Sequence, residues 1–130
     1  MTDEEREALT LLAYLFAQNG KPGKAATLLR ALEEIFPADT YIPRLLAECL
    51  LKQGESREAM RVTEKLLGLA EFSDTERRLA ALLHTQALWG LASEASEEGN
   101  PWRRSYDTSL ALYLGLAESA AEAEAKGKEA

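Results

Sequence analysis

Apolar residues recur at intervals of three and four along almost the whole chain, which is the spacing of one face of an α-helix. Leu9, Leu12, Ala13 and Phe16 show this pattern near the start. Alternation of β-branched and polar residues, which would indicate strands, is absent. The pattern therefore predicts an all-α fold.

Capping and breaking residues mark where the helices begin and end. Thr2 with Glu5, and Ser73 with Glu76, have the spacing of a capping box, in which hydroxyl and carboxylate each bond an orphan backbone N–H. Glycine and proline segments such as residues 20–23 interrupt the apolar pattern. We therefore predict six helices, spanning residues 3–19, 22–36, 40–53, 56–70, 74–98 and 102–126.

The chain resembles itself at an offset of 34 residues. Leu11 then aligns with Leu45, and Gly20 aligns with Gly54. The further matching pairs are Leu12 and Leu46, Ala13 and Ala47, Ala25 and Ala59, and Leu32 and Leu66. In such a repeat the large residues pack paired helices together, the alanines allow close backbone approach, and the glycines permit tight turns.

At this period the sequence resembles the tetratricopeptide repeat family. The residues that carry its signature are Leu9, Leu12, Ala13, Phe16, Gly20, Ala25, Leu29, Leu32 and Pro37. The resemblance implies an array of antiparallel helical hairpins, which forms one domain over residues 1–130 with repeats near 6–39 and 40–73.

The third copy of the repeat diverges from the first two. His84 takes an aromatic position of the repeat, and Leu88 takes the position of the turn glycine. We therefore expect a divergent C-terminal helix pair, with a degenerate third unit and a capping helix over residues 74–126. One long helix packed by a final helix is favoured, since solenoid ends need atypical caps, and a regular hairpin is the alternative.

Charge and hydropathy restrict where the protein works. The 22 acidic and 15 basic side chains give a formal charge of −7, which repels phosphate backbones and anionic lipid. No apolar run approaches the roughly 18 residues of a membrane span, and the acidic N-terminus lacks the features of a secretory signal. We expect a cytoplasmic protein that binds no nucleic acid and inserts into no membrane.

Candidate chemical groups are few, because the chain has one cysteine, Cys49, and one histidine, His84. We interpret both as packing residues, since we find no lysine or histidine near Cys49 in the sequence to activate the thiol, and His84 stands among leucines. Adjacent acids such as Glu33 and Glu34 splay about 100° apart on a helix and cannot converge on one atom. The sequence thus predicts no enzymatic activity, no cofactor and no metal site.

The resemblance implies a concave groove lined by the first helix of each hairpin. The residues that it places there are Thr10, Tyr14, Gln18, Tyr41, Arg44, Glu48, Leu51, Arg78 and Leu82. This set combines tyrosine and arginine anchors with leucine and adaptable polar groups, as binding hot spots do. The alternative is that Tyr14 and Tyr41 only pack between helices.

One binding role of tetratricopeptide proteins is disfavoured. The clamps that hold the C-terminal carboxylate of a heat-shock chaperone carry lysine and asparagine where this chain has Thr10, Tyr14 and Leu45. A carboxylate would find no cationic fork there.

Residues 15–37 and 44–67 look like the first two repeats of the small chaperones of bacterial type III secretion. This resemblance implies a chaperone or adaptor that holds an amphipathic helix of one protein partner in its groove. The alternative is a structural module whose C-terminal helix covers its own groove or forms a homodimer. Tyr106, Leu110, Tyr113 and Leu114 are the residues expected to bind a second copy or a small co-chaperone.

Overall fold

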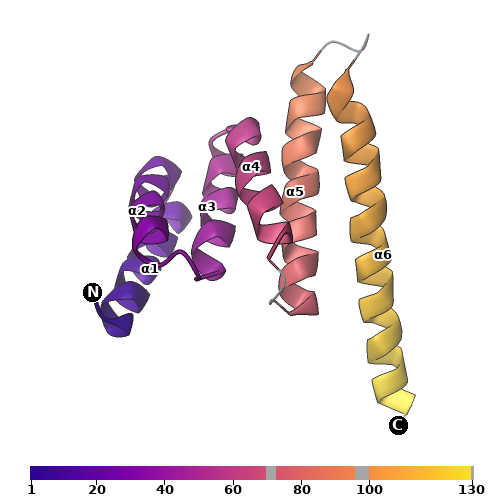
Figure 1. Cartoon of the computed structure of the whole chain (residues 1–130), viewed down its shortest axis with the longest axis horizontal. Coiled ribbons are helices and arrows are strands. Elements are labelled where there is room, and N and C mark those ends of the chain that lie inside the picture. Colours follow the sequence, from indigo (N-terminus) through magenta and orange to yellow (C-terminus); the bar gives the residue numbers. More distant parts are fainter. Residues whose placement is uncertain (70–72, 96–99, 130) are drawn as a thin grey trace.

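The computed structural model describes residues 1–69, 73–95 and 100–129, and these ranges hold six helices and no strand (Figure 1). The prediction of an all-α array is confirmed. The helices are α1 (Asp3–Gln18), α2 (Pro22–Ile35), α3 (Tyr41–Lys52), α4 (Ser56–Leu67), α5 (Asp74–Glu94) and α6 (Pro101–Glu129). The expected ends at residues 70 and 98 lie outside the described residues, and α4 and α5 end before them.

Each helix packs against the next, so the chain forms a row of hairpins (Figure 1). The first helices of successive hairpins also meet, because α1 contacts α3 and α3 contacts α5. The backbone of α6 packs against α5, and Arg57 of α4 places its guanidinium 5.7 Å from the ring centroid of Trp102. The last helix of the described chain therefore ends the row and does not lie in the groove between α1 and α3.

The two regular turns have one geometry. Gly20 and Gly54 have φ angles of 74° and 77°. The residue after each glycine donates its N–H to the carbonyl five residues back: Lys21 to Phe16 (2.8 Å), and Glu55 to Leu50 (2.9 Å). These bonds define the Schellman motif, in which glycine tolerates the left-handed backbone.

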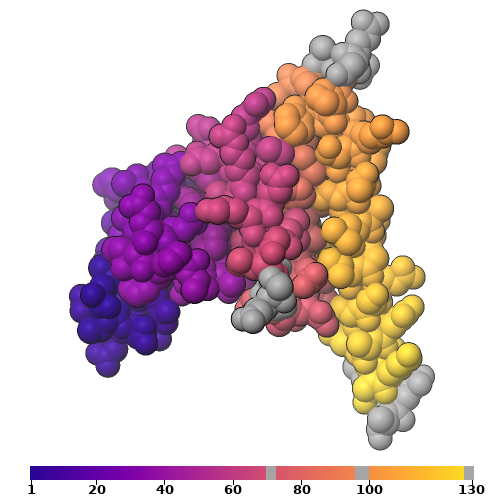
Figure 2. All heavy atoms as spheres, viewed as in Figure 1, coloured from indigo at the N-terminus to yellow at the C-terminus, as the bar shows by residue number. Residues whose placement is uncertain are grey.

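The third unit has no such turn. Leu88 occupies the equivalent repeat position and lies inside α5. A left-handed backbone costs an L residue with a side chain about 1–2 kcal/mol, so the helix continues through this point. The result is a hairpin of two long helices, in which the C-terminal part of α6 projects past the start of α5 (Figure 2). α6 extends to Glu129, beyond the predicted end at residue 126.

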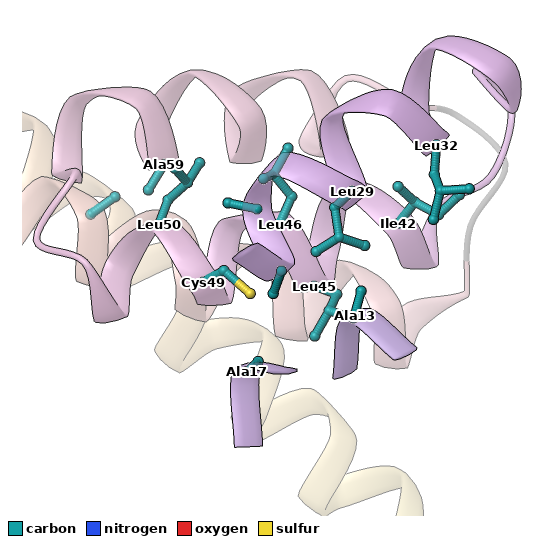
Figure 3. Packing of buried hydrophobic residues seen from close by; sticks show 13 residues of the cluster. Ala13, Ala17, Leu29, Leu32, Ile42, Leu45, Leu46, Cys49, Leu50 and Ala59 are labelled. Carbon is teal, nitrogen blue, oxygen red and sulfur yellow. The ribbon is translucent and has the colours of Figure 1, made fainter. Parts of the chain in front are cut away.

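The apolar core lies between the first four helices (Figure 3). Ala13 and Ala25 are fully buried where α1 meets α2, and Ile42 and Leu50 of α3 are also fully buried. Ala87 extends this core to α5. Small residues at the crossing points allow the helix axes to approach closely, which explains why alanine repeats at these positions.

Polar side chains join the last three helices. The Thr63 hydroxyl of α4 lies 2.8 Å from Nδ1 of His84 in α5, and the buried hydroxyls of Thr85 and Ser109 join α5 to α6 at 2.7 Å. These hydrogen bonds satisfy buried polar groups that would otherwise destabilise the packing.

Candidate functional site

A hollow open to solvent lies between α1 and α3, which we call the α1–α3 groove. The residues that line it are Arg6, Glu7, Thr10, Leu11, Tyr14, Asp39 and Tyr41. Tyr14 and Tyr41 are 39% and 41% exposed, so neither ring is confined to packing between helices. The groove therefore offers two accessible aromatic rings from two consecutive repeats.

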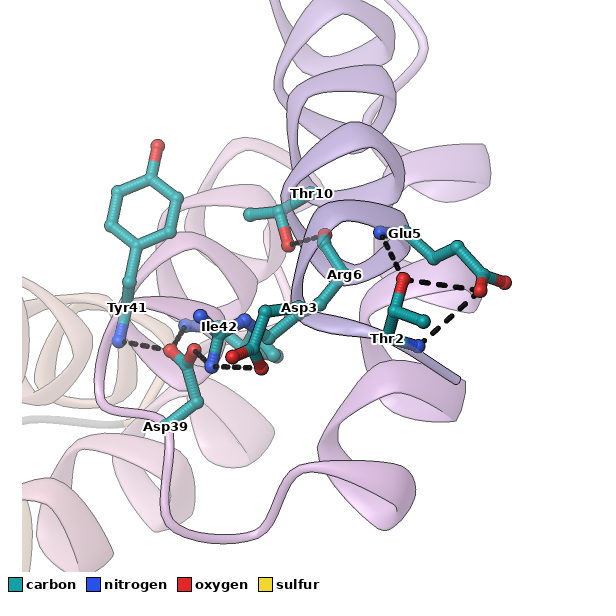
Figure 4. Close-up of polar contacts among 8 residues, drawn as sticks. All are labelled: Thr2, Asp3, Glu5, Arg6, Thr10, Asp39, Tyr41 and Ile42. Carbon is teal, nitrogen blue, oxygen red and sulfur yellow. Dashed lines mark hydrogen bonds and ion pairs between the residues drawn. The ribbon is translucent and has the colours of Figure 1, made fainter.

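Asp39 holds the start of α3 beside α1 (Figure 4). One carboxylate oxygen accepts the backbone N–H groups of Tyr41 (2.9 Å) and Ile42 (3.1 Å), and the other lies 3.4 Å from the guanidinium of Arg6. A carboxylate at a helix N-terminus satisfies free N–H groups and interacts favourably with the helix dipole. The contact fixes the position of Tyr41 relative to α1.

Arg44 continues the polar edge of the groove toward α5. Its guanidinium lies 4.9 Å from the ring centroid of Tyr41, a cation–π distance. Both residues also line a second, smaller hollow, together with Glu76 at the start of α5. Since Tyr41 borders both hollows, one surface runs from α1 across α3 to the beginning of α5.

The predicted groove residues take different places in the structure. Tyr14, Tyr41 and Arg44 line the hollows, and Gln18 and Glu48 are exposed outside the linings. Arg78 and Leu82 are half-buried on α5, also outside these two linings. The structure thus brings together Tyr14, Tyr41 and Arg44, whereas the other four residues line neither hollow.

Two predicted site residues are poor candidates for direct recognition. Thr10 is buried, and its hydroxyl donates to the carbonyl of Arg6 at 2.7 Å, so this donor is already used. Leu51 is half-buried and packs against the apolar core. Thr10 therefore supports the wall of the groove, and Leu51 contributes to the core.

Leu11, Arg6 and Asp39 line the groove but were not among the predicted site residues. Leu11 resembled a core position because its repeat partner Leu45 is apolar, yet only Leu45 is buried. The spacing of Leu11 from Glu7 and Tyr14, four and three residues, could have placed it on their face of the helix. Asp39 could have been identified as a cap that precedes the apolar start of α3.

Cys49 and His84 do not form a reactive site. Burial raises the pKa of the Cys49 thiol, while Lys52 opposes this effect and Glu48 adds to it. Contrary to expectation, a lysine does lie near Cys49, since Lys52 is one helical turn away, but burial outweighs its effect and keeps the thiol protonated. Burial also lowers the pKa of His84, against the opposing effects of Glu64 and the Met60 backbone.

A third hollow lies between the ends of α2 and α4. Its lining includes Glu33, Pro37, Val62, Lys65 and Leu69. None of the predicted site residues lines this hollow. The α1–α3 groove is therefore the better candidate site.

The described ranges lack the features of two other kinds of site. No cluster of three or more histidine, cysteine, aspartate or glutamate side chains could hold a metal ion there. No helix in the same ranges combines the length and the apolar character needed to cross a bilayer.

The tetratricopeptide repeat family matches residues 16–83, just over half of the chain. The protein is a member of this family. The match covers α2, α3 and α4 completely, together with parts of α1 and α5. No curated protein and no solved structure matches the chain. Tetratricopeptide repeats generally mediate interactions between proteins, and the α1–α3 groove is where this member presents its aromatic pair.

Proposed function

We propose that the protein is a cytoplasmic, non-enzymatic chaperone or adaptor that holds an amphipathic helix of a partner protein in the α1–α3 groove. The observation that carries the proposal is the pairing of Tyr14 and Tyr41 across this groove, each about two-fifths exposed. Tyrosines give large apolar contact area at little cost in conformational entropy, and they are enriched among binding hot spots.

The residues around the tyrosines fit an amphipathic ligand. Leu11 adds an exposed apolar side chain beside Tyr14, while Arg44 and Glu7 supply charges of opposite sign at the edges. A helix that places its apolar stripe on the rings would leave its polar edges toward these charges. Shielding the stripe would prevent the partner from associating with itself.

The resemblance to type III secretion chaperones supplies one partner class to test, an export component kept soluble before secretion. The alternative function, a module whose last helix covers its own groove, is disfavoured by the packing of α6 on α5. That packing leaves the groove open between α1 and α3.

The test is co-purification from the native cytoplasm with matched variants. Tyr41→Ala should weaken the affinity for the partner about ten- to a thousandfold, the range expected for a hot spot, and so reduce its recovery. The melting temperature should stay close to that of the wild type. Arg61→Glu on α4 is the control, because Arg61 is exposed outside the groove linings.

The captured protein is then cross-linked and a synthetic peptide of its bound segment is titrated against each variant. A segment that is helical when bound and sensitive to Tyr14→Ala supports the proposal. If Arg61→Glu loses the partner while folded Tyr41→Ala keeps it, the binding surface lies on α4 and the groove mechanism is wrong.

A further inference from the structure

The outer face of α1 carries leucines that the repeat elsewhere buries. Leu12 is 41% exposed and Leu15 is 45% exposed, whereas their repeat partners in α3, Leu46 and Cys49, are 2% and 0% exposed. The α3 residues are buried because α2 packs on α3. Within the described residues α1 contacts α2 and α3 alone. Its outer face therefore carries the apolar residues of a repeat junction, but no helix of the described chain packs on it.

The other end of the row presents a complementary surface. Trp89 of α5 and Leu114 of α6 are 50% and 55% exposed, and Trp89 lies 5.1 Å from Tyr106, measured between ring centroids. Tyr106, Leu110 and Leu114 are spaced four residues apart, so they follow one another along one side of α6. In the preceding hairpin, by contrast, α4 is covered by α5.

Charges at these two ends also complement each other. Within the chain, the starts of successive first helices lie side by side, since Arg44 of α3 and Glu76 of α5 line one hollow. Arg78 stands at the repeat position of Arg44, and it has no ion pair among the residues that the structure describes. The first turn of α1 is acidic, with Glu4 among its residues.

We propose that a second copy of this chain docks the outer face of its α1 on the α5–α6 surface, so that the helical row continues from one molecule into the next. If the α1 helix of the second copy packs on α5 in the way that α5 packs on α3, its Leu12 and Leu15 would cover Leu114. Its acidic first turn would then lie beside Arg78. The proposal does not depend on a partner helix in the α1–α3 groove.

This contact is heterologous, because two different surfaces meet. A symmetric pairing of α6 with α6 would leave Leu12 and Leu15 of α1 exposed, whereas the head-to-tail contact covers both ends with one type of junction. Heterologous contacts extend into chains or close into rings. The expected behaviour is therefore association that grows with concentration and weakens as salt screens the charges.

Sedimentation of the full chain over a range of concentrations provides the test. Leu15→Asp should block the outer face of α1, the head surface, and Leu114→Asp should block the α5–α6 surface, the tail surface. Each change should raise the dissociation constant about tenfold or more and leave mostly monomers. Both side chains are about half exposed, so the helical content should be unchanged. Leu112→Asp is the matched control, since Leu112 is 51% exposed but about 160° around α6 from Leu114, and it should still associate.

Mixing the two blocked variants is the decisive step. Leu15→Asp retains an intact tail and Leu114→Asp an intact head, so an equal mixture should form heterodimers and nothing larger. This rescue also requires that both variants be folded. A wild type that stays monomeric at every concentration would overturn the proposal, and so would a mixture that remains monomeric when the wild type associates.

Discussion

Gly90 of α5 lies directly against Ser56, the first residue of α4. A Cβ atom at position 90 would come within 2.9 Å of the Ser56 Cβ and still nearer to its hydroxyl. Gly90 is not a helix breaker, since α5 runs through it from Asp74 to Glu94. The second hairpin therefore approaches the third so closely at this point that a side chain larger than hydrogen does not fit.

Gly90→Ala should therefore lower the free energy of unfolding by about 1–3 kcal/mol, the usual cost of overpacking a close contact. Gly115→Ala on α6 is the control, because a Cβ there meets nothing within 4 Å. This substitution should stabilise the protein by up to about 1 kcal/mol through helix propensity. Urea unfolding measures both, and equal effects of the same sign would contradict the close contact.

The two turn glycines make a different prediction. Gly20→Ala and Gly54→Ala should each destabilise the protein by about 1–2 kcal/mol, because the left-handed backbone is strained for alanine although the added methyl group meets no atom. Gly54→Asn should cost less, since asparagine tolerates this conformation better. If Gly54→Asn has a lower melting temperature than Gly54→Ala, backbone strain is not the cause of the destabilisation.

Asp39 should act mainly as a helix cap. Asp39→Ala removes the acceptor of two N–H groups and the partner of Arg6, so we expect a loss of about 1–2 kcal/mol in the free energy of unfolding. Asp39→Asn retains a capping oxygen and loses only the charge, and it should cost less than the alanine variant. Equal losses in both variants would assign the effect to the ion pair with Arg6.

His84 should make the stability depend on pH. The Thr63 hydroxyl lies 2.9 Å from the Ala59 carbonyl and 3.0 Å from that of Met60, and its oxygen is 2.8 Å from Nδ1 of His84. Burial lowers the pKa of His84 below the value of about 6.5 in the unfolded chain, so the unfolded state binds the proton more readily. The free energy of unfolding should fall as the pH drops below about 6.5 toward the folded-state pKa, and stay constant above this range.

The measurement for His84 is urea unfolding at pH 7.5 and pH 5.5 for the wild type and His84→Gln. The variant should lose the part of the pH dependence that belongs to His84. An identical change in both proteins would show that the carboxylates alone account for it.

The helical fold and its 34-residue period follow from the amino-acid sequence alone. Leucines and alanines at helical spacing, repeated after 34 residues with Gly20 and Gly54 at the turns, permit few structures other than stacked hairpins. The divergence of the third unit was also visible, since Leu88 cannot cheaply take the backbone conformation of a turn glycine. The helices and the turns are local features, because each depends on residues within one or two helical turns. The period appears because the same local pattern recurs.

Which of two equivalent residues is buried depends instead on the contacts between hairpins. Leu11 and Leu45 are the same residue at the same repeat position, yet Leu45 is covered by a preceding hairpin and Leu11 borders the groove. The roles of Thr10, Leu51 and Gly90 likewise depend on neighbouring atoms that periodicity does not specify. A repeat pattern fixes the face on which a side chain lies, but burial depends on whether another helix packs on that face.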